Sequence, residues 1–415
     1  MIKTLNQAVI SLGGKGTRLS EITNQTPKPL WPIFGVHTLE RSIKNLKEYG
    51  INKFIFLLNF KFELFEKEKI LLEKKFNIKI ILFCEDEPLG EAGALLKVLD
   101  FLDNEFLFIN GDIIFNIDIK KIYNFHKEKD SDITFVTHTT NHPNDSDCII
   151  ETPSLTIQDF KYKNENIKNK FFYLGNAGFS LVSKKVIFFV NSYRKDNSKK
   201  LSFFRDFLIK AHLNKFRVFS YNTSEYLCDM GTPDRLIKVQ EDIQNNIPEK
   251  RSYKNDQKVL FIDRDNTIIK CSKGSYILSE KEIYLLDENI DKLSFLSNDF
   301  DFVVLISNQP QISMGLTSWQ NVININGEII KLCLKKDLII SCFYICPHHP
   351  HSGYNGELKY LKINCFCRKP NPGMFFEASF SRNINLEKSL MIGDSYADKY
   401  AAKNAGVPFA WINSL

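Results

Sequence analysis

The sequence predicts an α/β protein made of two doubly wound α/β domains in tandem. In the first third of the chain, short apolar runs with strand character alternate with helical patterns, and the same alternation restarts near residue 258. Strands that alternate with helices build parallel sheets covered by helices. A length of 415 residues agrees with this, at roughly 150 residues per domain.

The elements of the first domain follow from apolar spacing. Leu39, Ile43 and Leu46 are spaced i, i+4, i+7 ahead of Gly50, which predicts an amphipathic helix. A second helix is expected at residues 92–102. In the region 125–230, β-like runs mix with polar turns, so we expect added strands there. The four strands expected before it are Ala8–Leu12, Lys53–Leu58, Lys79–Phe83 and Phe106–Ile109.

Residues 241–257 are polar and lack apolar periodicity, so we expect a linker between a first domain at 1–240 and a second at 258–415. The alternative is a surface helix and loop inside one domain. The second domain's expected strands are 259–262, 302–306, 339–345 and 390–392, and its expected helices are 287–296, 322–334 and 396–404.

The composition narrows the function classes. Apolar residues make up 43% and charged residues 25%, as in a folded soluble protein, and the formal net charge of +6 is modest for this length. We therefore expect no nucleic-acid partner, although small anionic substrates fit. No apolar run approaches the roughly 18 residues of a membrane helix, and residues 1–12 do not resemble a signal peptide. Nine cysteines in so long a chain favour a reducing cytoplasm over a disulfide framework.

A glycine-rich turn follows the first strand. Glycines let a backbone approach a phosphate closely, and exposed N–H groups then form a cradle for an anion. The turn lacks the pattern of a Walker A loop or of a dinucleotide fingerprint. It contains Gly13, Gly14 and Gly16, with Lys15 and Arg18 adding positive charge.

Three further features point to phosphate and metal chemistry. Two prolines flank Lys28 and restrict the backbone that aims its ammonium group. Asp112, in a Gly-Asp pair, follows the strand 106–109, and a carboxylate at a strand's carboxyl end is well placed to hold Mg²⁺. Asp229, before Gly-Thr-Pro, is a second candidate ligand.

Taken in order, the motifs GGKGTRL, PKPL, GD and the aspartate before GTP resemble the sugar-1-phosphate nucleotidyltransferases over about residues 5–240. Residues 87–94, EPLGEAGA, look most like the guanylyltransferases for mannose 1-phosphate and manno-heptose 1-phosphate. The resemblance implies nucleotide contacts from Gly13, Gly14, Gly16, Lys15 and Gly90, catalytic contacts from Arg18 and Lys28 to the phosphates, Mg²⁺ on Asp112 and Asp229, and sugar-phosphate contacts from Lys163, Asn176 and Gly178.

The chemistry that this resemblance implies needs no covalent nucleophile. The sugar phosphate attacks the α-phosphorus of a nucleoside triphosphate, and pyrophosphate leaves, so cations must offset the repulsion between two anions. One departure from the family pattern concerns the sugar contacts, because Phe204 stands where a glutamate is common. The alternative is a domain that binds nucleotide or sugar phosphate without turnover.

The second domain begins with a strand that ends in two aspartates. Asp263 and Asp265 are spaced i, i+2, which on an extended backbone points both carboxylates the same way. One can attack phosphorus while the other handles the proton of the leaving group. Further polar residues end the next strands or follow them: Ser307, Asn308, Lys369, Asp394 and Asp398.

The order DxDxT, SNQ, Lys, GDxxxD resembles the haloacid dehalogenase phosphatase superfamily over about residues 258–415. The resemblance implies that Asp263 is the nucleophile and Asp265 the general acid/base. It also implies that Ser307 and Lys369 stabilise the phosphoryl group, and that Mg²⁺ is held by Asp263, Asp394 and the backbone of Asp265. Asn266 replaces the glycine that is common in this family.

Two tight pairs of metal-ligand residues lie between the last two motifs. Cys346 and His348 form one pair, and Cys365 and Cys367 form the other. Three thiolates and one imidazole satisfy a closed tetrahedral zinc site of the structural kind. His349 and His351 are alternative imidazole ligands, and the other reading is free cysteines beside surface histidines.

With CRKPNPGM, this zinc loop resembles the D-glycero-D-manno-heptose 1,7-bisphosphate 7-phosphatases, and histidinol phosphatases are the second possibility. The resemblance implies that Asn308 and Arg368 contact the substrate. Each domain then narrows the function expected for the other. Such a phosphatase leaves a heptose 1-phosphate, which the first domain would join to a nucleotide from a triphosphate. The resemblance implies that this triphosphate is GTP. The expected product is GDP-D-glycero-α-D-manno-heptose, made with Mg²⁺ in both domains and structural Zn²⁺ in the second.

Overall fold

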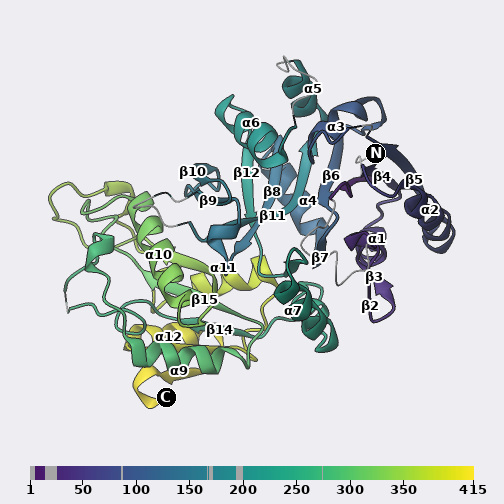
Figure 1. Ribbon diagram of the computed structural model, residues 1–415. Coiled ribbons are helices and arrows are strands. Elements are labelled where there is room, and N and C mark those ends of the chain that lie inside the picture. Colours follow the sequence, from purple (N-terminus) through teal and green to yellow (C-terminus); the bar gives the residue numbers. More distant parts are fainter. Residues whose placement is uncertain are drawn as a thin grey trace. The chain divides into compact units, whose positions relative to one another are not determined.

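A computed structural model describes residues 5–14, 26–85, 87–165, 167, 172–192, 200–272 and 274–415. The chain divides into two compact units (Figure 1). Unit 1 comprises residues 1–137, 176–221 and 225–252, and unit 2 comprises residues 138–175, 222–224 and 253–415. Among the described residues, no helix has the length and apolar character needed to cross a membrane.

Unit 1 is built on a parallel sheet. Its strands β1 (Gln7–Ser11), β4 (Lys53–Leu58), β5 (Lys79–Cys84) and β6 (Glu105–Asn110) lie in the order β6-β1-β4-β5. The chain leaves β1 toward β4 on one side and later returns to β6 on the other. The order of the strands therefore reverses between β1 and β6, which is where an open α/β sheet binds its ligands.

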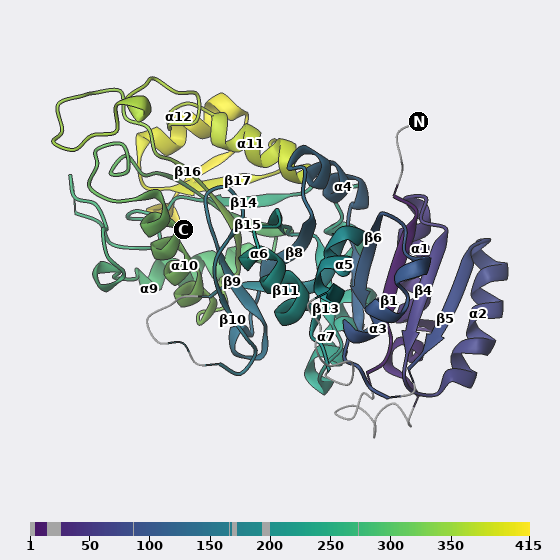
Figure 2. The same ribbon diagram turned by 90° about the horizontal axis from the view of Figure 1, so that it is seen from above.

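Helices cover this sheet and close its core. In α1 (Thr38–Glu48), Leu39, Ile43 and Leu46 are buried, as the apolar spacing predicts, and His37 caps the first turn. The helix α2 (Phe62–Phe76) lies beside the edge strand β5 in both views (Figures 1 and 2). The remaining helices of this unit are α3 (Gly93–Lys97), α4 (Ile119–Glu128), α5 (Lys184–Ser192), the π-helix η5 (Phe203–Ile209), α6 (Lys210–Leu213), α7 (Pro233–Gln244), α8 (Ile247–Lys250) and the 3₁₀ turns η2 (Lys28–Leu30) and η3 (Leu99–Phe101).

The region 125–230 contains the strands expected there. Strand β11 (Leu174–Ser183) pairs antiparallel with β6 and extends the sheet. β8 (Ile133–Thr139) pairs with β11 and with β12 (Val218–Asn222), and β9 (Cys148–Glu151) forms a hairpin with β10 (Ile157–Lys161). Separate two-stranded ladders join β7 (Ile113–Asn116) to β13 (Tyr226–Asp229), and β2 (Pro32–Ile33) to β3 (Val36–His37). The 3₁₀ turn η4 spans Pro143–Asp145.

The segment 241–257 has more structure than its polar composition suggests. α7 continues to Gln244, and the single turn α8 follows. Tyr253 is buried in the apolar core of unit 2, and Gln257 is also buried. Periodicity failed to signal this because the segment buries isolated side chains rather than a continuous stripe. The domain limits of 240 and 258 remain a prediction.

Unit 2 contains a five-stranded parallel sheet in the order β16-β15-β14-β17-β18. Figure 2 shows α11 and α12 on one face of it and α9 and α10 on the other, so this sheet is doubly wound. The bounds are β14 (Val259–Ile262), α9 (Asp287–Ser297), β15 (Phe302–Asn308), α10 (Trp319–Leu334), β16 (Ile340–Cys346), α11 (Gly373–Arg382), β17 (Leu390–Gly393), α12 (Tyr396–Ala405) and β18 (Phe409–Trp411), with 3₁₀ turns η6 (Glu280–Glu282), η7 (Lys359–Leu361) and η8 (Ile412–Ser414).

The strand order of unit 2 also reverses at its centre. β14 is central, β15 and β16 lie on one side, and β17 and β18 lie on the other. The reversal lies between β14 and β17, so residues that follow these two strands meet at one point of the sheet edge. The core beneath them is tightly packed, with the rings of Phe261 and Phe375 4.8 Å apart.

Candidate functional sites

A pocket of about 360 Å³ opens at the carboxyl edge of the unit 1 sheet. It brings together the start of the glycine-rich turn, Lys28, Gly90 and Asp112, which the sequence places far apart. The lining residues that matter below are Gly13, Gly14, Lys28, Asn59, Glu85, Gly90, Asn110, Asp112 and Lys200. Lys15, Gly16 and Arg18 lie outside the described residues.

The lysine between two prolines forms a 3₁₀ turn. Leu30 N–H donates to the carbonyl of Pro27 at 2.8 Å, and Pro29 is buried. The turn anchors the backbone while the Lys28 side chain lines the pocket. An ammonium group held in this way can approach a phosphate without a large loss of backbone freedom.

The glycines at this pocket have different reasons to be there. A Cβ at Gly13 would come no closer than 3.5 Å to Asn59, and a Cβ at Gly14 would meet nothing within 4 Å, so internal packing does not require these two glycines. Gly90 has φ +82°, and a Cβ there would lie 2.4 Å from the carbonyl oxygen of Leu201. Packing and backbone conformation together require glycine at position 90.

The two candidate Mg²⁺ ligands of unit 1 lie at the ends of two paired strands, Asp112 just before β7 and Asp229 at the end of β13. Asp229 pairs with Ile113 across β13 and β7, and Met230 N–H donates to the carbonyl of Asp112 at 3.0 Å. Only Asp112 lines the pocket. The Asp229 carboxylate accepts from the Arg235 guanidinium at 2.8 and 3.1 Å, so a cation bound there would have to compete with Arg235.

The candidate sugar residues are not all in one place. Gly178 has φ +68°, and a Cβ there would lie 2.6 Å from the Asn110 amide, so its lack of a side chain lets β11 approach the pocket wall. Asn176 precedes it on β11, and its Oδ1 lies 3.4 Å from Gly178 N. Lys163 belongs to unit 2, where it forms an ion pair with Asp145 at 2.6 Å, and it does not line the pocket.

A charged cluster lies at the strand reversal in unit 2. Lys369 Nζ is 2.6 Å from Asp263 Oδ1 and 2.6 Å from Asp398 Oδ1, and all three residues are buried. Oxygen atoms of Asp263, Asp394 and Asp398 lie within 4.8 Å of one another. The structure therefore brings together the ends of β14 and β17, the first turn of α12, and Lys369.

The electrostatics of this cluster favour a cation. Burial and the neighbouring Asp398 raise the pKa of Asp263 to about 7, against the opposing pull of Lys369. Burial and Asp398 also raise the pKa of Asp394. The raised pKa values show that negative charge is crowded around one ammonium group, and carboxylate oxygens are the ligands that Mg²⁺ prefers. These residues fit the expected Mg²⁺, which would offset this negative charge and supply electrostatic stabilisation of a bound phosphate.

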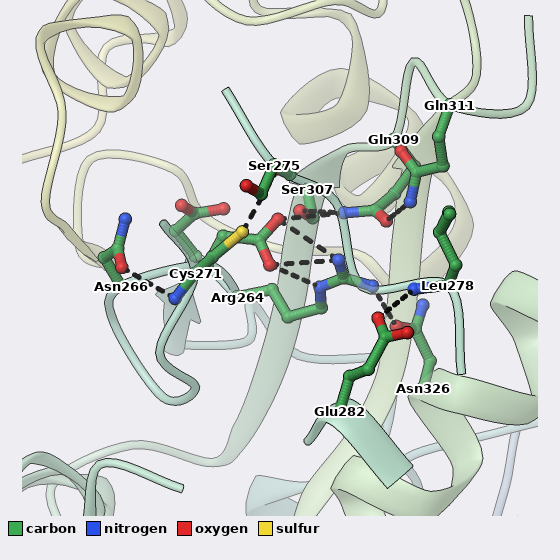
Figure 3. Close-up of polar contacts among 12 residues, drawn as sticks. Arg264, Asn266, Cys271, Ser275, Leu278, Glu282, Ser307, Gln309, Gln311 and Asn326 are labelled. Carbon is green, nitrogen blue, oxygen red and sulfur yellow. Dashed lines mark hydrogen bonds and ion pairs between the residues drawn. The ribbon is translucent and has the colours of Figure 1, made fainter. Parts of the chain in front are cut away.

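Asp265 is held outside this cluster. Its carboxylate accepts from Arg264 at 2.9 and 3.1 Å and from Gln309 Nε2 at 3.3 Å. Arg264 is fully buried, and its other side-chain partner is Asn326 on α10 (Figure 3). Gln309 also donates to the Ser307 hydroxyl at 2.8 Å, and this pair of bonds links the end of β15 to the Asp265 carboxylate.

Asn266 fits the position where a glycine is common. It has φ +56°, a left-handed conformation that asparagine tolerates better than most residues. Its Oδ1 accepts from Cys271 N–H at 2.9 Å, and its side chain also hydrogen bonds to Asp394. The asparagine therefore retains the turn and adds a contact to the carboxylate cluster.

Asn308 and Arg368 are partly buried, and both form hydrogen bonds within the protein. Asn308 and the backbone of Lys369 exchange two hydrogen bonds of 3.0 Å, which fixes the lysine above the strand ends. Arg368 donates to the carbonyl of His348 at 3.2 Å. Asn308 therefore acts at least as a positioning residue for Lys369.

The four candidate zinc ligands form one group. Their ligand atoms all lie within 4.8 Å of one another, five of the six separations are 3.3 to 3.6 Å, and no disulfide joins any of the nine cysteines. Such separations suit four ligands around one small ion. Arg368 N–H donates to Cys365 Sγ at 3.3 Å, a contact that stabilises a thiolate. His349 instead pairs with the backbone of His351.

Some site residues were not assigned a role by sequence. Asp398 was noted only for its spacing, yet it pairs with Lys369 and caps α12 through Ser395 at 2.6 Å. The GDxxxD spacing could have signalled it, because the first turn of a helix after Gly393 returns Asp398 to the strand end. Three further residues of the unit 1 pocket belong to none of the sequence motifs, and only the fold brings them there: Asn59, Glu85 and Lys200.

Comparison with known proteins identifies the first half. A sequence model of nucleotidyl transferases matches residues 7–246. The chain belongs to the nucleotidyl transferase family. The D-glycero-α-D-manno-heptose 1-phosphate guanylyltransferase of Aneurinibacillus thermoaerophilus is 30% identical over 242 residues, which cover 58% of this chain and 100% of that protein. The enzyme of the same name from Campylobacter jejuni is 32% identical over 228 residues, 55% of this chain and 96% of that protein.

Other comparisons extend this result. The crystal structure of an apo UDP-glucose pyrophosphorylase has 13% sequence identity and a TM-score of 0.50, covering 59% of this chain and 99% of that chain, which supports the fold of the first half. A model of HAD-hydrolase-like proteins, the haloacid dehalogenase group, matches residues 366–414. This nucleotidyl transferase therefore also carries a HAD-like phosphatase domain and is a bifunctional enzyme. Both family resemblances drawn from the motifs are confirmed.

Proposed function

We propose that the chain catalyses two successive steps toward a nucleotide-activated heptose. The second domain removes the 7-phosphate of D-glycero-D-manno-heptose 1,7-bisphosphate. The first domain joins the resulting 1-phosphate to GMP from GTP and releases pyrophosphate, giving GDP-D-glycero-α-D-manno-heptose. The observation that carries the proposal is the presence, in one chain, of a carboxylate–lysine phosphatase cluster and a first half similar along its length to heptose 1-phosphate guanylyltransferases.

In the phosphatase step, a carboxylate oxygen of Asp263 attacks the phosphorus, and the sugar oxygen leaves with a proton from Asp265. Lys369 stabilises the negative charge of the transferring phosphoryl group, and it is already held 2.6 Å from the attacking residue. The Ser307 hydroxyl accepts from Gln309, so its own proton remains available to a phosphoryl oxygen. Water then releases phosphate from Asp263.

In the transfer step, the two substrates react with each other. The glycine-rich turn and Lys28 would hold the triphosphate, and Asp112 would hold its Mg²⁺, with Asp229 as a second ligand. Their common position around one pocket supports these roles for Gly13, Gly14, Lys28 and Asp112. We also propose that Lys163, Asn176 and Gly178 bind the sugar phosphate. Nucleotide contacts would come in addition from Lys15, Gly16 and Arg18.

Two further elements belong to the proposal. Zn²⁺ on Cys346, His348, Cys365 and Cys367 would be structural, since all four ligands come from the protein. Domain limits at 240 and 258 would separate the two activities. A cytoplasmic location is supported by nine cysteines without a disulfide.

Product analysis tests the proposal. The purified chain is incubated with Mg²⁺ and each anomer of the bisphosphate, with each nucleoside triphosphate in turn, and the products are identified by mass spectrometry. We expect phosphate release without nucleotide, and GDP-heptose with pyrophosphate when GTP is present. Phosphate release without any sugar nucleotide would instead favour a first domain that only binds its ligands. Activity on histidinol phosphate or mannose 1-phosphate in preference to the heptose compounds would replace the substrate assignment.

A further inference from the structure

The carboxylate of Asp265 is held from two directions (Figure 3). Its Oδ1 accepts from Arg264 Nε at 3.1 Å and from Arg264 Nη2 at 2.9 Å. Its Oδ2 accepts longer bonds, from Arg264 Nη2 at 3.2 Å and from Gln309 Nε2 at 3.3 Å. One of these donors directly precedes Asp265 in the chain, and the other follows β15.

Each of the two donors is in turn fixed by a buried amide. Asn326, on α10, accepts from Arg264 Nη1 at 3.1 Å through its Oδ1. Gln311 Nε2 donates to Gln309 Oε1 at 2.7 Å. Asn326 and Gln311 are almost completely buried, with exposed fractions of 1% and 0%. Both therefore act on Asp265 through another side chain.

The orientation of the Gln309 amide depends on Gln311. A side-chain amide has donors at one end and an acceptor at the other. Because Gln309 Oε1 accepts from Gln311, its Nε2 faces Asp265 and the Ser307 hydroxyl. With the Gln309 amide reversed, a carbonyl oxygen would face the carboxylate and two NH₂ groups would face each other. Gln311 thus selects the orientation in which Gln309 can hold Asp265.

The turn that carries Gln311 is closed by bonds of its own. Leu316 N–H donates to the carbonyl of Gln311 at 3.0 Å. The Ser313 hydroxyl donates to the carbonyl of Pro310 at 2.8 Å. These bonds fix the backbone from which the Gln311 amide reaches Gln309, so the amide has a stable support.

Internal packing alone does not account for the two amides. Gln311 Oε1 and Asn326 Nδ2 are buried atoms without a hydrogen-bond partner among the described residues. A buried polar atom without a partner lowers stability, so an apolar side chain would suit either position better if only packing mattered. The bond that each amide does form leads to Asp265, through Gln309 or through Arg264.

We propose that Asn326 and Gln311 are positioning residues for the general acid of the phosphatase. They fix Arg264 and Gln309, which hold the Asp265 carboxyl group where the leaving sugar oxygen can take its proton. As the bond between phosphorus and that oxygen breaks, the oxygen keeps the bonding electron pair and accepts the proton. This inference rests on the proposed phosphatase step and adds to it two residues that act through their neighbours.

The test compares two leaving groups. A sugar oxygen leaves as a strongly basic alkoxide unless it is protonated, whereas p-nitrophenolate is a stable anion and needs no proton. For the full-length chain with Mg²⁺, kcat/KM is measured with heptose 1,7-bisphosphate and with p-nitrophenyl phosphate. This constant covers the steps up to departure of the leaving group. A residue that only supports the fold should affect both substrates equally, and one that positions the acid should affect mainly the bisphosphate.

Asn326→Leu keeps the branched shape but removes the acceptor for Arg264. We expect kcat/KM to fall about 10-fold with the bisphosphate and less than about 2-fold with p-nitrophenyl phosphate. Asn326→Asp retains an acceptor and should keep the ratio of the two constants within about 2-fold of wild type. Asn324→Leu is the matched control on the same helix. Asn324 accepts a 3.4 Å bond from Gln320, and its substitution should leave both constants unchanged.

Gln311→Met tests the support of Gln309. It keeps the side-chain length but removes the donor, and kcat/KM should fall about 10-fold with the bisphosphate. With p-nitrophenyl phosphate the loss should be about 3-fold, because Ser307 also loses a neighbour of fixed orientation. Differential scanning calorimetry shows whether each variant folds. Should Asn326→Leu not fold, Gln311→Met provides the same comparison.

Asp265→Asn separates this inference from the proposed function. It should lower kcat/KM by at least about 10²-fold with the bisphosphate and much less with p-nitrophenyl phosphate. Given that result, equal losses with both substrates in Asn326→Leu and Gln311→Met, or no loss with either, overturn the inference and leave the proposed phosphatase step standing. Equal losses in Asp265→Asn would contradict both. If the chain prefers another sugar phosphate, the substrate assignment fails, and the same comparison with that compound still decides the inference.

Discussion

The two sites use the same position in their sheets but are prepared differently for their substrates. Each lies where the strand order reverses, between β1 and β6 in unit 1 and between β14 and β17 in unit 2. In unit 2 the charged groups of the candidate site already contact one another, as Asp263, Lys369 and Asp398 do. In unit 1 the corresponding residues, Lys28 and Asp112 among them, surround a pocket of about 360 Å³.

This difference follows from the chemistry. A phosphatase that forms a covalent bond through its own carboxylate needs that group aligned in advance, so its polar residues hold each other in place. A transferase that joins two substrates needs room for both and supplies mainly position and charge. The same topological feature therefore supports a compact reactive cluster in one unit and a ligand-sized space in the other.

The largest effect should come from Asp263→Asn. An amide of the same shape cannot attack phosphorus, so phosphatase kcat should fall by about 10⁴-fold or more. Nucleotidyl transfer should remain within about 2-fold of wild type, because the two sites use different sheets. Phosphate release is measured with the bisphosphate, and pyrophosphate release with heptose 1-phosphate and GTP. Loss of both activities in a folded variant would contradict the independence of the sites.

Lys28→Met tests the unit 1 pocket. It preserves most of the side-chain length but removes the charge at the triphosphate, and nucleotidyl transfer should fall by about 10² to 10³-fold. Phosphatase kcat should not change. Lys238→Met, which removes an exposed lysine of α7, is the control and should leave both activities intact. A Lys28→Met enzyme with full transfer activity would remove this lysine from the mechanism.

Removal of the zinc-type ligands should affect one unit only. Cys365→Ser weakens a four-ligand group whose metal binding contributes to folding, so bound metal should fall from about one ion per chain to well below half. The phosphatase half should then melt earlier, while transfer activity persists. Metal analysis and differential scanning calorimetry measure these effects, and Cys84→Ser, at an exposed cysteine, is the control. Unchanged metal content would show that Cys365 is not a metal ligand.

The smallest effect should come from Asn308→Ala. It removes both hydrogen bonds that fix the Lys369 backbone but leaves the lysine and the carboxylates present. We expect phosphatase kcat to fall about 10-fold, equivalent to about 1.4 kcal/mol, with little change in KM. A rise in KM with unchanged kcat would instead assign Asn308 to direct substrate binding.

Much of this molecule could be predicted from local sequence patterns. The strands β4, β14 and β15 and the helix α1 follow from apolar spacing, since each buries a regular stripe or run. The positions of Gly13, Gly14, Asp112, Asp263 and Asp394 at the sheet edges were predictable, because these residues follow strands whose carboxyl ends lie at one edge. Their roles stay predictions. Patterns failed where side chains are buried singly, as at Tyr253, and they did not reveal ion pairs between separate segments, such as that of Lys369 with Asp398.

The sequence by itself determined that two α/β units with two sets of phosphate-handling motifs occur in one chain, because short motifs and periodicity are local properties. Only the tertiary structure decided which groups meet. It paired Lys369 with Asp398, turned Asp265 toward Arg264, tied Asp229 to Arg235, and brought Asn59 and Glu85 to the wall of the unit 1 pocket. These contacts depend on strand order and on the packing of helices against sheets, and residues far apart in the chain supply them.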